Sequence, residues 1–419
     1  MIKILHFADA HIDIAAHGKH DPESGLPVRV LDFLKALDTI VDTAISEKVD
    51  LVIFAGDAYK DRTPSPTFQR EWGKRIMHLS AAAIPTLLLV GNHDISPATG
   101  RAHTLQEFAT LEVPHIHVID RPVFLKPEDL EGLPLQVLGL PWIFRSSLLA
   151  ATELSGENPD QINKEIENRI SEVFNQWLGE LDPTLPAVLT AHGSVQGALY
   201  GNERGVMLGR DLILPGNIVK DPRLDYVALG HIHKAQDVNQ GSYPPVVYPG
   251  SIERVDFGEV NDEKFFVIAK VEKGNTTYEF RPLHGRHFID RHVQIETGDN
   301  LMEKILTVIP DPEQIKESIC RLVIDYPHAM DSLLDESDIR GRCSEALEFH
   351  LVRRPHDEAR RRLPSDESIA SQTPLQLLKD YLDSVNQHTV ETEPLLKLAA
   401  SIIESAASGN PPEEESLPG

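Results

Sequence analysis

Short apolar runs alternate with longer helical patterns through the first part of the chain. Residues 2–8 and 51–55 are apolar-rich runs typical of buried strands, and residues 28–44 carry apolar side chains at helical spacing. A helix over residues 66–82 and a strand over residues 86–90 repeat the same unit. This alternation predicts a mostly parallel sheet that is covered by helices.

The later part of the chain shows a different pattern, so the predicted fold is α/β with α+β elements. Further strands are predicted over residues 135–138, 187–190 and 226–229, with a helix over residues 159–178. Antiparallel strands are predicted over residues 246–248, 265–271 and 277–283, with a turn at Lys273-Gly274-Asn275.

The pattern changes again near residue 284. Residues 284–364 predict a small α+β domain, with strands near Val293 and Leu322 and helices near Leu301 and Arg342. Residues 374–405 contain two amphipathic stretches, and the Pro- and Glu-rich residues 408–419 predict a disordered tail.

Composition narrows the class of protein. A chain of 419 residues is long enough for two or three domains, and no apolar run suggests a signal peptide or a membrane span, so we expect a soluble, cytoplasmic protein without a membrane partner. Cys320 and Cys343 offer neither a disulfide framework nor a thiolate zinc site. The formal net charge of -25 argues against binding nucleic acid through bulk electrostatics but does not exclude a nuclease.

Seven potential metal ligands follow predicted strands in one order along the chain. They are Asp9, His11, Asp57, Asn92, His192, His231 and His233. Each motif alone is also typical of a surface turn or a polar strand edge, but their repetition at successive strand ends favours a metal site. Carboxylate, imidazole and amide oxygen without thiolate suit manganese, iron or zinc.

Asp57, and two residues that directly follow Asn92, have further predicted roles. Asp57 is the natural bridge between two ions, because one carboxylate can bind both. His93 follows a ligand without being one, so it can hydrogen-bond a phosphoryl group and protonate a leaving alkoxide. Asp94 either orients the His93 imidazole or is a turn residue.

These residues match the motifs of the calcineurin-like metallophosphoesterase superfamily, D-x-H, G-D, G-N-H, H and G-H-x-H. Within it the chain resembles the SbcD-type DNA repair nucleases over its first 285 residues, through residues 26–34, 56–66 and 248–254. The resemblance implies a four-layer α/β/β/α sandwich with a small α+β cap domain and C-terminal helices. It assigns residues 1–283 to the nuclease, 284–364 to a DNA-contacting cap and 374–405 to a helical element that binds a partner ATPase.

The resemblance also implies a mechanism and partners. It places Asp9, His11, Asp57 and His233 around one metal, and Asp57, Asn92, His192 and His231 around the other. The implied activity is a manganese-dependent double-strand DNA exonuclease and single-strand endonuclease that acts in double-strand break repair. It would work as a homodimer within a heterotetramer with an SbcC-type coiled-coil ATPase, in the cytoplasm and associated with the nucleoid.

Further residues outside the metal site are predicted to contact DNA or the partner, and each of them has an alternative interpretation. Lys60 and Arg62 would contact DNA, although Lys60 stands where some relatives carry a histidine and is otherwise an exposed loop residue. Arg353 and Arg354 would contact DNA from the cap, or form a solvated helix face. The partner ATPase would bind apolar positions that otherwise pack on their own domain: Leu375, Leu378, Leu382, Leu395 and Leu398.

Two other functions compete with the nuclease. A phosphatase or an esterase for small phosphodiesters would use the same metals, but such phosphatases follow G-D with Asp-Arg-Gly, whereas here Asp61-Arg62 comes one residue late and Thr63 follows. A non-catalytic scaffold for the ATPase would be expected to lack ligands, and the sequence retains all seven.

Overall fold

The computed structural model describes residues 1–14, 18–95, 101–143, 159–201, 213–356, 375–376, 378–379 and 392–408. Within it the chain forms two compact units. The first comprises Met1–Ile289 and Glu317–Ile319, and the second comprises Asp290–Lys316 and Cys320–Gly419. Each unit is built around its own apolar core.

The first sheet combines the predicted parallel strands with an antiparallel hairpin. Its strand order is β14-β13-β1-β2-β3-β4, and β1 to β4 run parallel. The strands are β1 (Ile2–Phe7), β2 (Leu51–Phe54), β3 (Thr86–Leu89), β4 (Ile116–Ile119), β13 (Lys264–Glu272) and β14 (Asn275–Leu283). Because Glu272 pairs with Asn275, the β13–β14 turn has only two residues, and Gly274 takes a positive φ there.

A second sheet of six strands faces the first, so the single covered sheet predicted from alternation is replaced by two. Its order is β11-β12-β10-β7-β6-β5, with β12, β10, β7 and β6 parallel. The strands are β5 (Val123–Leu125), β6 (Gln136–Leu140), β7 (Ala187–His192), β10 (Tyr226–Gly230), β11 (Gln236–Asp237) and β12 (Val246–Tyr248). A short pair, β8 (Ser194–Val195) and β9 (Ile213–Leu214), lies apart.

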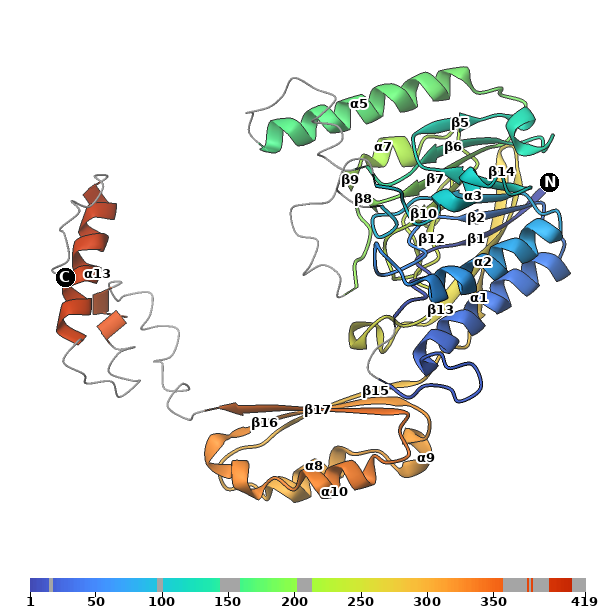
Figure 1. The fold of residues 1–419 in the computed structure, drawn as a ribbon. Coiled ribbons are helices and arrows are strands. Elements are labelled where there is room, and N and C mark those ends of the chain that lie inside the picture. The colour runs from blue at the N-terminus through green and yellow to red at the C-terminus, as the bar shows by residue number, and fades with distance from the viewer. Residues whose placement is uncertain are drawn as a thin grey trace. The chain divides into compact units, whose positions relative to one another are not determined.

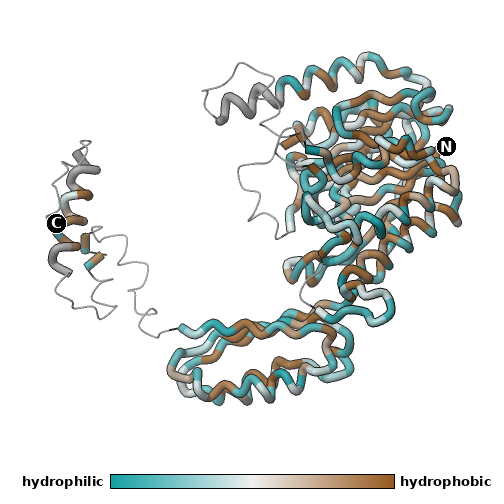
Figure 2. The backbone as a smooth tube through the Cα atoms, viewed as in Figure 1, coloured by the Kyte–Doolittle hydropathy of each residue, from teal (hydrophilic) through white to brown (hydrophobic). Residues whose placement is uncertain are grey.

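The two sheets and their helices form the four-layer α/β/β/α sandwich (Figure 1). Alternation along β1 shows why, because Leu5 and Phe7 pack with α1 and α2 while Ile4 packs between the sheets. Both faces of the central strands are buried, which accounts for their continuous apolar runs, visible as the brown interior strands of Figure 2. The covering helices are α1 (Val28–Ser46) and α2 (Pro66–Ala81) on one face, and α5 (Pro159–Glu180) and α7 (Gly216–Val219) on the other.

The predicted elements of this unit are confirmed to within a few residues, and the unpredicted ones are short. They are β4, β5, β8, β9, α3 (Gln106–Thr110), η1 (Pro127–Leu130), α7, β11 and η2 (Phe257–Glu259). Their brevity, and the half-buried pattern of β5, leave little periodicity for a sequence argument to detect.

The second unit contains a three-stranded sheet of order β15-β16-β17. Its elements are β15 (Phe288–Gln294), α8 (Leu301–Val308), α9 (Pro312–Ile315), β16 (Ile319–Pro327), η3 (His328–Leu333), α10 (Glu336–Arg342) and β17 (Glu348–His356). Ile305 and Ile339 from the helices join Leu322 and Ile324 of β16 in one core. The alternative of a solvated helix face for Arg353 and Arg354 is wrong, because both lie on the strand β17.

Further along the chain the structure describes α13 (Thr392–Ser408), on which Leu395 and Leu398 are exposed. The predicted tail, from residue 409 on, lies outside the described residues. No helix in the described part of the chain has the length and apolarity to cross a membrane.

Candidate metal centre

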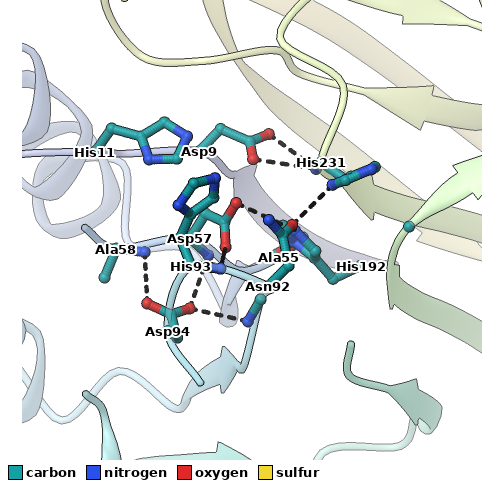
Figure 3. A network of polar contacts seen from close by, with 12 residues as sticks. Asp9, His11, Ala55, Asp57, Ala58, Asn92, His93, Asp94, His192 and His231 are labelled. Atoms are coloured by element: carbon teal, nitrogen blue, oxygen red, sulfur yellow. Dashed lines mark hydrogen bonds and ion pairs between the residues drawn. The ribbon is translucent and has the colours of Figure 1, made fainter. Parts of the chain in front are cut away.

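The ligand-bearing turns at the carboxyl ends of the strands share an unusual backbone conformation. Asp9 and His11 follow β1 with φ of 50° and 41°, Asp57 follows β2 with φ of 65°, and His231 follows β10 with φ of 100°. Positive φ costs energy for residues other than glycine, and such strain is concentrated at functional sites. At this edge it turns the chain off each strand, so that the side chains converge (Figure 3).

One cluster is formed by Asp9, His11 and His233, each offering a ligand atom within 4.8 Å of the others. The Nδ1 of His11 donates to the Tyr59 carbonyl at 3.2 Å, which leaves its Nε2 facing the Nε2 of His233 at 3.1 Å. The Asp9 carboxylate accepts the backbone N–H of His231 at 3.0 Å and so joins the two sheets. All of these side chains are buried.

The second cluster is formed by Asp57, His192 and His231, which also converge within 4.8 Å. The Nδ1 of His192 donates to the Ala55 carbonyl at 2.6 Å, and its Nε2 lies 3.4 Å from Asp57 Oδ2. Asn92 belongs to this group, because its Oδ1 lies 3.0 Å from His192 Nε2 and 2.9 Å from His231 Nδ1. The structure therefore brings together all seven ligands predicted from the sequence.

Two glycines make this close approach possible. A Cβ on Gly56 would collide with the His192 imidazole, and a Cβ on Gly91 would collide with the Asp57 carboxylate. Gly56 also takes a φ of +100°, which side chains rarely adopt. The G-D and G-N-H motifs thus hold glycine because a predicted ligand from another strand end occupies the space of its side chain.

The pKa values of the ligands show strong mutual interaction. Burial raises the pKa of Asp9 to about 7, against the attraction of His233 and His192. Burial would lower the pKa of His192, but the neighbouring Asp57 carboxylate raises it to about 9. Burial opposes ionisation of Asp57 as well, yet the surrounding imidazoles hold its pKa below the usual range. Asp57 and His192 therefore stabilise each other's charged forms.

This donor set fits two divalent cations. Each cluster supplies one carboxylate and two imidazoles, and Asn92 adds a neutral oxygen to the second. The other ring nitrogen of His11, His192 and His233 is held by a carbonyl or a carboxylate, which fixes the nitrogen that faces the cluster. These residues would hold two divalent metal ions.

His93 lies beside the clusters and uses one ring nitrogen to fix its orientation. Its Nδ1 donates to the Lys60 carbonyl at 2.7 Å, its backbone N–H donates to Asp57 Oδ1 at 2.8 Å, and its ring centroid lies 5.2 Å from that of His11. Burial lowers the pKa of the His93 imidazole, despite the opposing attraction of Asp57. His93 is half-buried, so the residue is partly accessible to solvent.

Asp94 contacts the loop backbone, and the polar partner of the His93 ring is Lys60. The Asp94 carboxylate accepts the N–H groups of Asp57, Ala58 and Gly91 at 2.8 to 3.0 Å, and the Thr104 hydroxyl at 3.0 Å. Of the two roles considered for Asp94, these contacts support the turn residue and not the orientation of His93. Asp94 thereby ties the G-D loop to the G-N-H loop.

A cavity of about 720 Å³ opens next to His93. Lys60 and Arg62 line it together with Asp13 and Phe68. The Asp13 carboxylate accepts the backbone N–H groups of Lys60 and Asp61, and Arg62 Nε donates to the Asn92 carbonyl at 3.2 Å. Two exposed cations thus lie at the rim of the metal centre.

The remaining predicted contact residues lie in the second unit. Arg353 is exposed and forms an ion pair with Glu336 at 3.0 Å, and Arg354 is exposed on the same strand. Leu395 and Leu398 are 50% and 58% exposed, whereas Leu375 and Leu378 are half-buried. Leu382 lies outside the described residues.

Three residues near the ligands were not predicted. The ring of Trp142 packs against the His231 imidazole, with 5.0 Å between the ring centroids. Glu259 accepts a hydrogen bond from His233 at 2.7 Å. Lys264 is buried and forms an ion pair with Glu259. No spacing links these residues to the motifs, so only the tertiary fold reveals them.

The sequence model of the family described as calcineurin-like phosphoesterase matches residues 2–235, a range that includes every ligand from Asp9 to His233. The chain is 25% identical over 433 residues to the DNA double-strand break repair protein Mre11 of Archaeoglobus fulgidus, covering 99% of this chain and 89% of that protein.

Two bacterial proteins are similar over shorter regions. The SbcD component of the nuclease SbcCD from Escherichia coli is 25% identical over 280 residues, covering 65% of this chain and 66% of that protein. The uncharacterized metallophosphoesterase YhaO of Bacillus subtilis is 26% identical over 296 residues, covering 68% of this chain and 60% of that protein. The chain thus spans somewhat less than two thirds of the length of each of these two relatives.

Proposed function

Because the chain belongs to the calcineurin-like phosphoesterase family, we propose that it hydrolyses the phosphodiester bonds of DNA as a two-metal nuclease. The observation that carries the proposal is the convergence of two ligand clusters beside His93, which is not a ligand. The similarity to a protein named for DNA double-strand break repair extends over 99% of the chain and supports DNA as the substrate. We infer exonuclease activity on double strands and endonuclease activity on single strands.

The side chains would divide the chemistry between them. The two ions, which we propose to be manganese, would polarise the phosphoryl group and activate water. Asp57, which belongs to the second cluster and also interacts electrostatically with His11 of the first, would bridge the two ions, and Asn92 would add an oxygen ligand without adding charge. Since the Lys60 carbonyl holds Nδ1 of His93 as a donor, the protonated ring would pass its Nε2 proton to the leaving alkoxide and remain as the neutral Nδ1–H form.

DNA contacts would begin at the cavity next to His93. Its exposed Lys60 and Arg62 offer two cations for backbone phosphates close to the leaving-group side. Such local cations matter in a chain whose net charge is -25, because the overall field repels DNA. Arg353 and Arg354 on β17 would supply further phosphate contacts.

The exposed apolar residues of α13 favour a protein partner. Leu395, Leu398 and Ile402 are each at least half exposed. An amphipathic helix of this kind fits an apolar groove on another chain. We propose that the partner is an SbcC-type coiled-coil ATPase, that two copies of each chain assemble, and that the complex acts on the nucleoid in the cytoplasm.

The test of this function uses purified full-length protein with Mn²⁺ and end-labelled linear double-stranded DNA. The expected result is progressive shortening of the labelled strand, together with cleavage of circular single-stranded DNA to linear fragments. A His192→Ala variant purified in the same way reports any contaminating nuclease. Hydrolysis of bis-p-nitrophenyl phosphate with DNA left intact, both alone and with the ATPase partner, would contradict the proposal.

A further inference from the structure

A chain of three buried polar side chains leads away from the metal centre into the protein. His233 Nδ1 donates to Glu259 Oε1 at 2.7 Å, and Lys264 Nζ donates to Glu259 Oε2 at 2.7 Å. The side chains of Glu259 and Lys264 are 4% and 1% exposed. A burial this complete is rare for lysine and requires that the ammonium group is fully paired.

The surrounding groups satisfy this pair. Lys264 Nζ also donates to the Ser251 hydroxyl at 2.8 Å and lies 3.4 Å from the His233 carbonyl. The N–H of Val255 donates to Glu259 Oε2 at 2.9 Å. Lys264 on β13 thus contacts Glu259, which is the side-chain partner of His233, and also the backbone of His233. These contacts hold His233 against β13.

Stability alone gives a weak reason for such a pair. Removing two charges from water costs several kcal/mol per ion, and replacing a buried ion pair by apolar side chains is often neutral or stabilising. A reason specific to this site comes from comparing the histidines. His11 and His192 donate to backbone carbonyls, whereas His233 donates to a charged carboxylate.

We propose that Glu259 and Lys264 are positioning residues for one of the two metal ions. Glu259 fixes the His233 ring with Nε2 toward Asp9 and His11 and increases the basicity of that nitrogen. Lys264 keeps Glu259 in place and charged. Because His233 belongs to only one cluster, the effect is confined to the ion held by Asp9, His11 and His233. The proposal rests on the two-metal centre of the proposed function and does not depend on DNA as the substrate.

The test is a titration of metal-free, full-length protein with Mn²⁺, in which free Mn²⁺ is measured by electron paramagnetic resonance without any DNA. Glu259→Gln keeps the shape of the side chain but removes its charge. The double variant Glu259→Leu with Lys264→Met removes both charges together, so no uncompensated ion remains buried. Glu263→Leu changes an exposed acid next to Lys264 and is the matched control.

Wild type and the control are expected to bind two ions. Glu259→Gln is expected to weaken one binding event about tenfold and the double variant up to about 100-fold, with the second event kept. Thermal unfolding of the metal-free proteins measures the stability of each variant separately from its metal affinity. If the pair had a purely structural role, the double variant, in which no unpaired charge is buried, would regain wild-type metal binding.

Three results would overturn the proposal. They are two ions bound with wild-type affinity by Glu259→Gln, two ions bound with wild-type affinity by a folded double variant, or equal weakening of both events in Glu259→Gln. If the double variant does not fold, Glu259→Gln alone decides the outcome. A wild-type protein that binds two ions but leaves DNA intact contradicts the proposed nuclease and not this inference.

Discussion

Two buried histidines close together in sequence, His6 and His11, show what distinguishes a structural polar group from a functional one. His6 lies on β1, and both of its ring nitrogens have partners on β10, the Tyr226 hydroxyl at 3.1 Å and the Leu229 carbonyl at 3.2 Å. His11 lies just past the end of β1, and its Nδ1 is the ring nitrogen for which the described residues supply a carbonyl partner. Its Nε2 faces another imidazole nitrogen at 3.1 Å.

His6 and His11 differ in the hydrogen-bond partners of their ring nitrogens. Both side chains are fully buried, so each nitrogen needs a partner. His6 finds them within the protein and joins the two sheets. The facing Nε2 atoms of His11 and His233 satisfy each other only when a proton or a metal ion lies between them. Two facing imidazole nitrogens therefore mark the metal centre, whereas pairing with a hydroxyl and a carbonyl marks the core.

The largest effect is expected from changing Asp57, the carboxylate proposed to bridge the two ions. Asp57→Asn is expected to reduce bound Mn²⁺ from two ions to at most one and to lower phosphodiester hydrolysis on the order of 10³-fold or more. Folding is expected to persist, since the amide keeps the shape of the carboxylate. Metal titration and cleavage of labelled DNA measure the two effects.

The matched control for Asp57 is Asp42→Asn, which changes an exposed acid on α1. It is expected to leave metal binding and cleavage unchanged. Two ions bound by Asp57→Asn with wild-type affinity would show that Asp57 is not the bridge.

A smaller effect is expected from His6, whose burial makes the stability of the fold depend on pH. Burial lowers the pKa of His6 to about 3 from 6.5. The unfolded chain therefore binds more protons at this residue below pH 6.5, so its contribution to stability is complete above that pH and falls toward pH 3. Between pH 7 and pH 5 the loss is about 2 kcal/mol.

The measurement is urea unfolding of metal-free wild type and His6→Gln at several pH values. The variant is expected to be less stable at pH 7, because it pairs less well with β10, and to depend less on pH. The other imidazoles titrate in both proteins and cancel in the difference. An equal slope for both proteins would contradict a buried neutral His6.

The ligands and most strands could be predicted because their signals are local. Strands buried on both faces leave continuous apolar runs, and each ligand lies at the end of such a run or within four residues of it, as Asp57 does after β2. Parallel carboxyl ends lie at one edge, so the order of the motifs was enough to predict convergence. The separation into two sheets came from the resemblance, since alternation alone predicted one.

The supporting residues could not be predicted because they are joined only by the fold. Glu259 lies 26 residues from His233 along the chain and reaches it from η2. The backbone role of Asp94 depends on the Asp57 loop, 37 residues away. The strand β17 was not predicted because its side chains are half-buried or exposed, so its sequence contains no continuous apolar run.

The most direct test of the account is to measure bound metal and DNA cleavage together in His93→Gln, with the exposed His78→Gln as the control. His93→Gln is expected to bind two Mn²⁺ ions as wild type does and to cleave linear DNA about 10² to 10⁴-fold more slowly, because only proton transfer is lost. Cleavage at the wild-type rate, or loss of an ion together with activity, would contradict a catalytic role for His93 that is separate from the metals.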